Sequence, residues 1–556
     1  MNLSLQWPRP MVRGWSLMLA WLRPASAAPA DFPFAASDVA LYHRTLAGAV
    51  IDTGAAAAAA AADDTAVDDA TWSDLLLDQY SDRLARQTSI FGQQMLHRRL
   101  RTGRAGDASV ERVGALAHDA PRLALLTRGC ESLRHATSEV SALLFGAAHD
   151  AAPRWAAHLR WLPLAFLLSP VAVLALGWGP LWLVVVALWV ALMLVQMRWY
   201  DSVQQWESSL QALQQMLRAH SLLAALDDPY AQAFRAGRAR AGKINRALAR
   251  SSLEKVVPAA REYADWLWLQ NVRHYFASRD VVLLHRDFLR DSYRLLAELE
   301  ADLALARHLA QTPRHCWADV DDDIDGGLAL EAMVHPLLAG AAPLSFALAG
   351  KGAFISGQNG IGKSTLLRGV GLNMVVARAF GFCYADAARM ALMPVYSSMQ
   401  TEDSLVSGES LYIAELRRAR ELLARAAGGR PALFIIDEIF RGTNHLESIS
   451  AAAAVLHKLA QSGRVIVSSH NLVLAPLLAG SLTPLCVSAP GGDQSRLHIA
   501  PGVLAETNGI ALLAARGFGA DIADQARRVH DWLSDYMAHP GDCDKVWDRE
   551  SGAAPA

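Results

Sequence analysis

The feature that most limits how this chain can fold is a long stretch without a charged residue, which runs from Trp161 to Met197. As a single helix the stretch would span roughly 55 Å, far more than the hydrocarbon core of a bilayer, which is about 30 Å thick. The sequence Gly177-Trp178-Gly179-Pro180 lies at its centre and favours a turn. The stretch therefore predicts a hairpin of two short transmembrane helices, near residues 161–176 and 181–197.

Side chains at the ends of this stretch favour a membrane environment. Tryptophans gather near the ends of both predicted helices, where interfacial aromatic residues belong, and arginines flank the same side of the hairpin. These residues are Trp161, Trp178, Trp182 and Trp199, and Arg154, Arg160 and Arg198. The positive-inside rule then places both flanks in the cytoplasm and the protein in the inner, or cytoplasmic, membrane. The alternative is a hairpin buried in a soluble protein, although few soluble helices tolerate so long a charge-free stretch.

The whole chain of 556 residues is too long for one hydrophobic core, and its sequence pattern changes several times. An alanine run from Ala55 to Ala62 is followed by aspartates, so residues 1–70 are expected to be a disordered or low-complexity tail. Apolar residues at helical spacing predict an all-α domain, which the hairpin interrupts. The expected boundaries are 71–155 and 199–311 for the two parts of this domain, 158–198 for the hairpin, 312–530 for a second domain and 531–556 for a tail.

The second domain has a different pattern, because short apolar runs there alternate with helical segments. The predicted strands are 344–348, 353–356, 433–436 and 465–468, and the predicted helices are 366–379, 411–427 and 451–461. Strands that alternate with helices indicate an α/β domain with a mostly parallel sheet.

Charge and cysteine content set weaker limits. The net charge of -2 provides no overall attraction to nucleic acid or to an anionic membrane, although local basic patches can still supply one. The five cysteines lie far apart and form no C-x-x-C pair. This spacing argues against a disulfide framework and a zinc site, and it suits a reducing compartment.

Residues Gly357 to Ser364 match the phosphate-binding pattern G-x-x-x-x-G-K-[ST] in full. They follow the predicted strand 353–356 and open the next predicted helix, which is the context that the pattern requires. Glycines let backbone N–H groups turn onto phosphate oxygens, and the helix N-terminus adds positive potential. Lys363 is expected to reach the β- and γ-phosphates of ATP, and Ser364 to bind Mg²⁺. The expected nucleotide contacts are Gly357, Gln358, Asn359, Gly360, Ile361, Gly362, Lys363, Ser364 and Thr365.

Two other predicted strands end in candidate catalytic residues. The apolar run 433–436 leads into Asp437 and Glu438, and the run 465–468 leads to His470. Because ligands meet a parallel sheet at the carboxyl ends of its strands, we expect these side chains near the phosphate loop. Asp437 is expected to hold Mg²⁺, and Glu438 to orient and deprotonate the attacking water. His470 is expected to sense the γ-phosphate, with a structural role as the alternative.

The order of these motifs resembles the ATPase domain of the MutS family of DNA mismatch-repair proteins, over about residues 330–530. The most specific matching string is Asp437-Glu438-Ile439-Phe440-Arg441-Gly442-Thr443. The other matching stretches are Gly357–Thr365, Asp403–Glu415, Ser468–His470 and Pro501–Ala526, and upstream Arg86–Leu100 and Leu295–Leu309 resemble the family's core and lever helices. The resemblance implies an ABC-like P-loop NTPase fold and a homodimer with composite ATP sites, in which Ser410 completes the nucleotide site of the neighbouring subunit. It also implies DNA as a partner.

The chain departs from the family pattern in ways that bear on function. Leu411 stands where the family usually has Thr, too little sequence precedes Trp72 for the mismatch-reading domains, and the hairpin interrupts the lever region. The expected function is that of a membrane-anchored MutS-like ATPase, with its ATPase domain in the cytoplasm and without specific mismatch recognition. Basic residues that could contact DNA phosphates, or form a solvated helix face, are Arg98, Arg99, Arg101, Arg235, Arg238, Arg240, Lys243 and Arg246.

Two other functions stay open at this point. An ABC-type transport ATPase is one of them, because Val406-Ser407-Gly408-Glu409 superficially resembles an ABC signature loop. Two short helices are few for a translocation path, however. The other is an ATP-regulated membrane scaffold that does not bind DNA.

Overall fold

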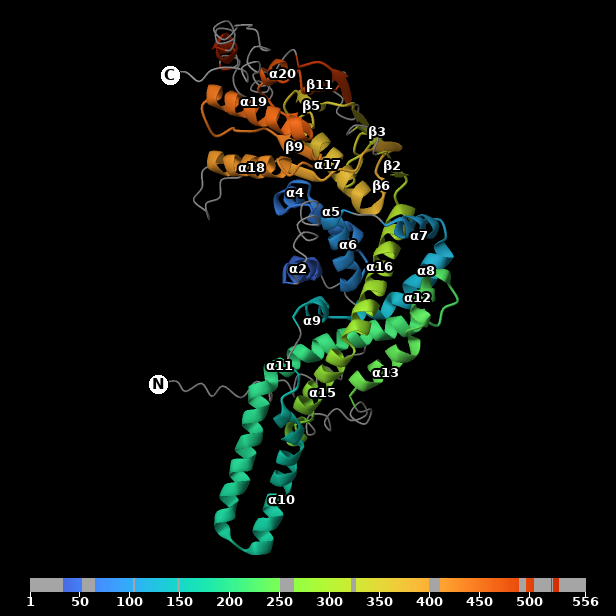
Figure 1. Cartoon of the computed structure of the whole chain (residues 1–556), viewed down its shortest axis with the longest axis vertical. Coiled ribbons are helices and arrows are strands. Elements are labelled where there is room, and N and C mark those ends of the chain that lie inside the picture. Colours follow the sequence, from blue (N-terminus) through green and yellow to red (C-terminus); the bar gives the residue numbers. More distant parts are fainter. Residues whose placement is uncertain are drawn as a thin grey trace.

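The computed structural model describes residues 34–52, 66–103, 106–147, 151–250, 265–321, 327–399, 411–489, 497–504, 522 and 524–529. These residues form an elongated molecule (Figure 1). The β-sheets lie at one end, a helical part lies in the middle, and a pair of long helices projects from the other end.

A six-stranded sheet forms the centre of the C-terminal part. Its strand order is β12-β11-β5-β10-β9-β8, and every neighbouring pair is parallel except β11 and β12. The strands are β5 (Gly352–Gly357), β8 (Val395–Ser398), β9 (Leu433–Asp437), β10 (Arg464–Ser468), β11 (Leu482–Ser488) and β12 (His498–Pro501), and the helices between them are α17 (Lys363–Phe380), α18 (Leu411–Ala426), α19 (His445–Ser462) and α20 (Leu474–Leu477). The mostly parallel sheet that the sequence predicts is confirmed.

The predicted strand 344–348 does not belong to this sheet. It is β4 (Leu344–Leu348), at the edge of a smaller sheet with β3 (Leu328–Met333), β7 (Ala387–Met390) and β2 (Asp319–Val320). β3 pairs antiparallel with both β4 and β7. The connection from β3 to β4 contains no helix, which suits antiparallel pairing, because parallel neighbours need a longer crossover. A further pair, β1 (Cys316–Trp317) and β6 (Phe382–Cys383), is also antiparallel.

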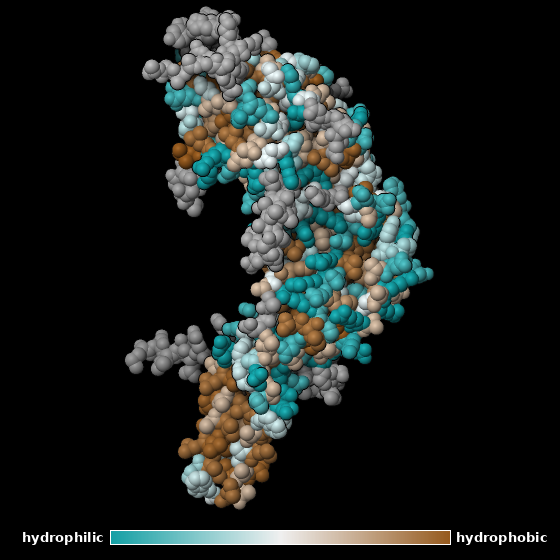
Figure 2. All heavy atoms as spheres, in the orientation of Figure 1, coloured by the Kyte–Doolittle hydropathy of each residue, from teal (hydrophilic) through white to brown (hydrophobic). Residues whose placement is uncertain are grey.

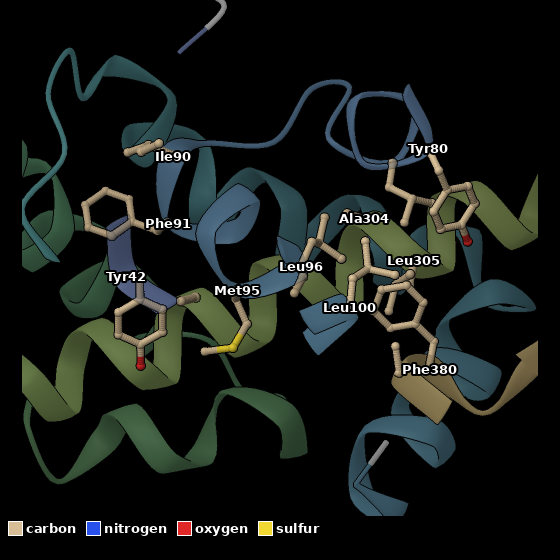
Figure 3. Packing of buried hydrophobic residues seen from close by; sticks show 14 of the residues in the cluster. Tyr42, Tyr80, Ile90, Phe91, Met95, Leu96, Leu100, Ala304, Leu305 and Phe380 are labelled. Atoms are coloured by element: carbon tan, nitrogen blue, oxygen red, sulfur yellow. The ribbon is translucent and has the colours of Figure 1, made fainter. Parts of the chain in front are cut away.

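The middle of the molecule is a layered set of helices around α16. Its elements are α4 (Asp69–Asp74), α5 (Leu77–Leu84), α6 (Ile90–Thr102), α7 (Asp107–Ala117), α8 (Ala120–Cys130), η1 (Glu131–His135), α9 (Ser141–Phe145), η4 (Pro229–Ala231), α12 (Gln232–Arg235), α13 (Arg238–Leu248), α15 (Gln270–Leu284) and α16 (Arg286–Ala310). Leu96 and Leu100 of α6 lie beside Ala304 and Leu305 of α16 (Figure 3), and all four are buried. This close packing of long apolar stripes holds the helical part together.

The expectation of a disordered tail over residues 1–70 is wrong for part of that range. Residues Ala36–Asp52 form helix α2, which packs against α6 and α9. Tyr42 of α2 is fully buried, its ring lies 5.0 Å from that of Tyr293, and its hydroxyl accepts a hydrogen bond from Arg98 at 3.1 Å. The helix before the alanine run of residues 55–62 was not predicted, because composition does not show that an aromatic side chain such as Tyr42 is buried.

Two apolar helices form the projecting end of the molecule. α10 (Trp161–Leu176) begins after the short helix η2 (Arg154–Arg160), ends at Gly177, and returns through η3 (Gly179–Leu181) into α11 (Trp182–Leu223). Gly177 adopts φ 66°, a left-handed conformation that suits glycine at a helix end. We call α10, η3 and residues 182–197 the apolar extension; most of its visible surface is hydrophobic in Figure 2, apart from paler residues near its tip.

The sequence predicted a short second helix, near residues 181–197, but the helix in the structure is long. α11 has 42 residues and continues past Met197 into the helical part, where Leu210, Leu213 and Leu217 are buried. No Gly or Pro interrupts the sequence between Trp182 and Leu223, so no local signal ends the helix at the edge of the apolar stretch. The extension is therefore joined to the helical part by one continuous helix.

The helical part meets the six-stranded sheet at its edge strand β8. Arg418 of α18 donates to the Ser397 carbonyl through Nε at 2.8 Å and through Nη2 at 2.6 Å, and it forms an ion pair with Asp68 at 2.9 Å. Asp74 of α4 accepts hydrogen bonds from the Ser397 hydroxyl at 2.7 Å and from the Met399 amide at 2.9 Å. These polar contacts fix α4, β8 and α18 to one another.

Candidate nucleotide-binding site

The phosphate-binding pattern lies in a tight loop between β5 and α17. Every residue of β5 is buried, and the strand ends at Gly357. A side chain on Gly357 would place a Cβ atom 2.7 Å from the carbonyl oxygen of Val487, which explains why glycine stands there. Gly360 and Gly362 adopt φ 77° and 100°, and Gly362 caps the N-terminus of α17. The strand, loop and helix that the pattern requires are all present.

Lys363 is the first residue of α17, and its side chain folds back into the loop. The ammonium group donates to the carbonyl oxygens of Gly357 at 2.9 Å and of Gln358 at 3.2 Å. The residue is only 8% exposed. Burial lowers the pKa of Lys363, while the negative charges of Asp437 and Glu438 oppose the shift. The amine is thus held inside the loop and faces two carboxylates.

The two carboxylates follow β9 at the same edge of the sheet. Asp437 is the last residue of β9 and stands opposite Ser468 of β10, whose hydroxyl donates a hydrogen bond to Asp437 Oδ1. The next residue, Glu438, has φ 60°, and its amide donates to the Ser468 carbonyl at 2.9 Å. A left-handed conformation is costly for a residue with a side chain, so the chain turns here under constraint from its neighbours.

Glu438 is paired with His470 and lies near Arg441. His470 Nε2 lies 2.8 Å from Glu438 Oε1, and Arg441 Nε lies 3.9 Å from Glu438 Oε2. The hydrogen bond from His470 lowers the pKa of Glu438; burial opposes this effect, and the charges of His470, Arg441 and Lys363 support it. Glu438 is consequently an ionised carboxylate at neutral pH.

A buried glutamate on α18 contacts the arginine of the loop after Glu438. Glu415 is 4% exposed, and its Oε1 lies 3.4 Å from Arg441 Nε. Gly442 lies so close to the start of α18 that a Cβ atom would be 2.9 Å from the Tyr412 amide nitrogen. The loop after Glu438 is thereby packed against the first turn of α18.

The structure brings most of the sequence-predicted residues to one edge of the sheet. β5, β9 and β10 are neighbours and parallel, so the loop with Lys363, the pair Asp437 and Glu438, and His470 all follow the carboxyl ends of adjacent strands. Ser410 lies outside the described residues. The sequence analysis gave no role to Ser468 and Glu415. The position of Ser468, two residues before His470 at the end of a predicted strand, could have indicated that Ser468 belongs to the site.

The residues present fit a magnesium ion. Mg²⁺ prefers hard oxygen ligands and usually binds one or two protein oxygens together with water and substrate phosphates. Asp437 supplies a carboxylate that Ser468 orients, and Ser364 supplies a hydroxyl in the first turn of α17. Within the described residues no group of three or more His, Cys, Asp or Glu side chains forms a separate metal cluster.

A glycine-rich connection between a strand and a helix, beside an acidic strand end, is typical of α/β domains of the ATPase type. Residues 353–534 match the family model of MutS domain V. The chain is 26% identical to the DNA mismatch repair protein MutS of Thermus thermophilus over 267 residues, which cover 46% of this chain and 32% of that protein. It is 31% identical to MutS of Dinoroseobacter shibae over 273 residues, which cover 45% and 30% of the two chains.

A third relative, MutS 1 of Halobacterium salinarum, is 27% identical over 263 residues, with 45% and 30% of the two chains covered. Residues 353–534 are thus similar to MutS domain V, and the similarity to whole MutS proteins covers somewhat less than half of this chain. The matches extend over about a third of the length of these curated relatives.

Proposed function

We propose that this protein is a Mg²⁺-dependent ATP hydrolase of the MutS type. The observation that carries the proposal is the Glu438–His470 pair, with its 2.8 Å contact, at the sheet edge that also holds the Lys363 loop. An ionised carboxylate at this edge can accept a proton from the attacking water, and His470 keeps it ionised and oriented. Residues 357–365 would bind the phosphates, with the ammonium of Lys363 already inside the loop.

Mg²⁺ would supply charge neutralisation between the β- and γ-phosphates. Asp437 and Ser364 are the protein oxygens that would hold it, and the hydrogen bond from Ser468 fixes the direction of the Asp437 carboxylate. A hydroxyl that orients a metal-binding carboxylate typically contributes to metal affinity.

The chemistry is tested by replacing the proposed base. A Glu438→Gln variant keeps the shape of the side chain but removes its ability to accept a proton. We expect ATP binding to persist and turnover to fall by roughly 10²- to 10⁴-fold, the usual contribution of a general base. Glu331→Gln, an exposed glutamate on β3, is the matched control. Wild-type turnover in Glu438→Gln would refute the role of Glu438.

We further propose that the protein works as a homodimer with composite ATP sites, as the family resemblance implies. The loop 438–443 is packed against the start of α18, and the chain just before α18 carries Ser410. By the family resemblance, Ser410 would complete the nucleotide site of the second subunit, so ATP bound at this edge would join the two subunits. The mass of Glu438→Gln in light scattering should double when ATP is added; an unchanged monomer mass would contradict the dimer.

The apolar extension is proposed to enter the cytoplasmic membrane, with both flanks and the ATPase domain in the cytoplasm. Two helical stretches, Arg154–Leu176 and Gly179–Leu223, are long and apolar enough to cross a bilayer, and the most apolar window of each is only 17% and 11% buried. Leu174, Leu183 and Met197 are 78%, 74% and 72% exposed. A helix that is apolar all round is stable in a membrane or in a protein core, and these helices are not in a core.

The membrane proposal is tested by removing the extension without disturbing its base. The rings of Trp155 and Trp199 lie 6.0 Å apart, so the two flanks can be rejoined by a short Gly-Ser linker in place of residues 161–197. We expect the full chain to float with liposomes and the shortened chain to stay in the dense fraction. Equal flotation of both would contradict the role of the extension.

DNA binding without sequence or mismatch preference is the partner proposal that follows from the family. The relatives are named DNA mismatch repair proteins, but the matched region covers only about a third of each. An ATP-regulated membrane scaffold is the second candidate, favoured by the extension at the far end of the helical part. Binding of homoduplex, mismatched and branched DNA by the detergent-solubilised protein separates the two: no binding at low salt with intact ATP hydrolysis would leave the scaffold.

A further inference from the structure

Helix α13 carries a dense basic face that the proposed ATPase chemistry does not use. Its buried side consists of Ala241, Ile244 and Leu248. Four cations on the remaining surface are exposed, and the helix contains no acidic residue. These cations are Arg238, Arg240, Lys243 and Arg246, and we call them the α13 basic face.

Carboxylates in the described part of the chain do not neutralise this face. Arg246 donates to the carbonyl of Gly242 in its own helix, and Arg240 lies over the ring of Phe288 at 4.9 Å. The acidic residues nearby are engaged elsewhere: Asp227 pairs with Arg235, Asp265 with Arg250 and Asp287 with Arg290. The pKa of His285 is lowered, first by desolvation and then by the charges of Arg240 and Lys243. Within the described residues, no carboxylate therefore forms an ion pair with the four cations of the α13 basic face.

α13 lies against the continuation of α11 beyond the apolar extension: the Leu248 carbonyl accepts a hydrogen bond from Gln214 at 2.8 Å, and Gly237, just before α13, lies beside His220. α13 packs against the second half of α11 and against α15. In Figure 1 it lies below this half of α11, on the same side as the apolar extension. Its buried residues face α11, so its cations point away from α11. Arg250, two residues after α13, pairs with Asp265, and the exposed residues Leu267 and Trp268 follow Asp265 just before α15.

The base of the extension itself is rich in aromatic rings. Phe276 of α15 lies 5.3 Å from Trp155 and 5.0 Å from Trp199, and Arg160 and Arg198 lie over the rings of Trp161 and Trp199. Tryptophan and arginine side chains at the end of an apolar helix pair are typical of a membrane–water interface.

We propose that the α13 basic face binds the headgroups of anionic phospholipids in the membrane that the apolar extension enters. The inference rests on the membrane part of the proposed function. Basic clusters at the cytoplasmic end of a membrane helix are attracted to anionic lipid over about one Debye length, near 8 Å in physiological salt. The extension brings α13 to that surface, and the exposed Leu267 and Trp268 add apolar contacts at the same border.

Lipid is favoured over nucleic acid by position. A DNA duplex bound to this face from the side of the apolar extension would overlap with the bilayer that surrounds the extension. The four cations also lie along one helix of 11 residues beside interfacial aromatic residues, which suits a flat anionic surface. Nucleic acid is the competing occupant in the experiment.

The test places a fluorescent probe on the basic face of the full-length protein. Ala239 is exposed between the four cations, so an Ala239→Cys variant carries the dye, and the parent protein without this cysteine supplies the labelling background. The protein is reconstituted into neutral phosphatidylcholine vesicles or vesicles that also contain phosphatidylglycerol, both with a headgroup-linked quencher. We expect quenching to be stronger in the anionic vesicles and to weaken with added salt.

Matched variants separate lipid contact from general charge effects. Replacing Arg238, Arg240, Lys243 and Arg246 by Gln should abolish the difference between anionic and neutral vesicles. Replacing four distant exposed cations, Arg420, Lys458, Arg527 and Arg528, by Gln should preserve it. Equal quenching in both vesicle types, or a difference that survives the α13 replacements, would overturn the inference.

Two further outcomes are distinguishable. A full-length protein that does not float at all contradicts the membrane part of the proposed function, whereas one that floats without the quenching difference contradicts only the α13 inference. If duplex DNA shields the probe on vesicle-bound protein and the α13 replacements abolish this protection, nucleic acid is the occupant and the lipid inference is wrong.

Discussion

At the level of single residues, the charge of Glu438 depends on three neighbours: His470, Arg441 and Lys363. The hydrogen bond from His470 is the largest of the effects that lower the pKa of Glu438 below its ordinary value of 4.5. Glu438 has a left-handed backbone conformation directly after β9, and its side chain contacts His470 at 2.8 Å. These contacts therefore keep Glu438 ionised, which is the form that the proposed base requires.

Removing His470 should change the pH dependence of ATP hydrolysis. Glu438 must be ionised to accept a proton, so turnover falls as the pH drops through its pKa. In His470→Ala the pKa of Glu438 should rise, because the main stabilising hydrogen bond is lost, and the acidic limb of the normalised turnover profile should move to higher pH. His118→Ala, an exposed histidine on the helical part, should leave the limb in place. A profile that keeps its shape in His470→Ala would show that His470 does not control Glu438.

At the level of secondary-structure elements, the site depends on the contact between α18 and the loop after β9. Gly442 makes this contact possible, since the Tyr412 amide nitrogen and Cβ would lie 2.9 Å and 3.0 Å from a Cβ atom there. The Arg441–Glu415 pair joins the same two elements. Any shift of α18 is thus transmitted to the loop that carries Glu438.

A Gly442→Ala variant should separate these two elements. The added methyl group has no space, and overpacking of this kind typically costs about 1–3 kcal/mol. We expect a lower thermal unfolding midpoint together with reduced ATP turnover, measured on the same preparation. Gly480→Ala is the control, because nothing lies within 4 Å of the Cβ atom it would introduce. Equal behaviour of the two variants would show that the contact is not tight.

At the level of the whole molecule, a polar junction around Arg418 helps to hold the helical part against the six-stranded sheet. Arg418 connects Asp68, Thr71 and the Ser397 carbonyl. Burial opposes ionisation of Asp68, but hydrogen bonds and charge from Arg418 leave its pKa below the ordinary value. The net contribution of this pair to stability is fully present above the ordinary pKa near 3.8 and is lost as the pH falls through the lowered value.

Breaking this junction should destabilise the protein as a whole. Arg418→Met leaves a largely buried carboxylate and a buried carbonyl without their partner, a change that costs about 3 kcal/mol in comparable buried pairs. Chemical unfolding at neutral pH should show this loss, and Asp68→Asn in the same chain should restore part of it. Arg420→Met, on the exposed side of the same helix, should have little effect. Additive losses in the double variant would mean that the two residues do not interact.

Local sequence patterns predicted the elements of the ATPase domain well. The strand 433–436 and the helix 411–427 correspond to β9 (Leu433–Asp437) and α18 (Leu411–Ala426). Strand alternation, helix periodicity and glycine spacing are local properties, so they can be read without knowledge of the fold. The positions of Lys363, Asp437, Glu438 and His470 at strand ends followed from the same patterns.

Partners that are distant along the chain could not be predicted in this way. Composition could not show that Tyr42 packs on Tyr293, that Arg418 pairs with Asp68, or that strand 344–348 joins a second sheet. These contacts depend on which surfaces remain to be covered once the elements have formed. Similarly, α11 passes Met197 without a break because its next stripe of leucines is buried against other helices.

The sequence by itself determined the phosphate loop, the acidic strand end and the charge-free stretch, because each depends on residue types at fixed local spacing. Only the tertiary structure decided that β5, β9 and β10 are neighbours, so that these motifs meet at one edge of a sheet. It also decided that the charge-free stretch is exposed instead of buried, and that α13 packs against α11 beyond that stretch. Burial and proximity are properties of the packed chain, since they depend on every element that could cover a given surface.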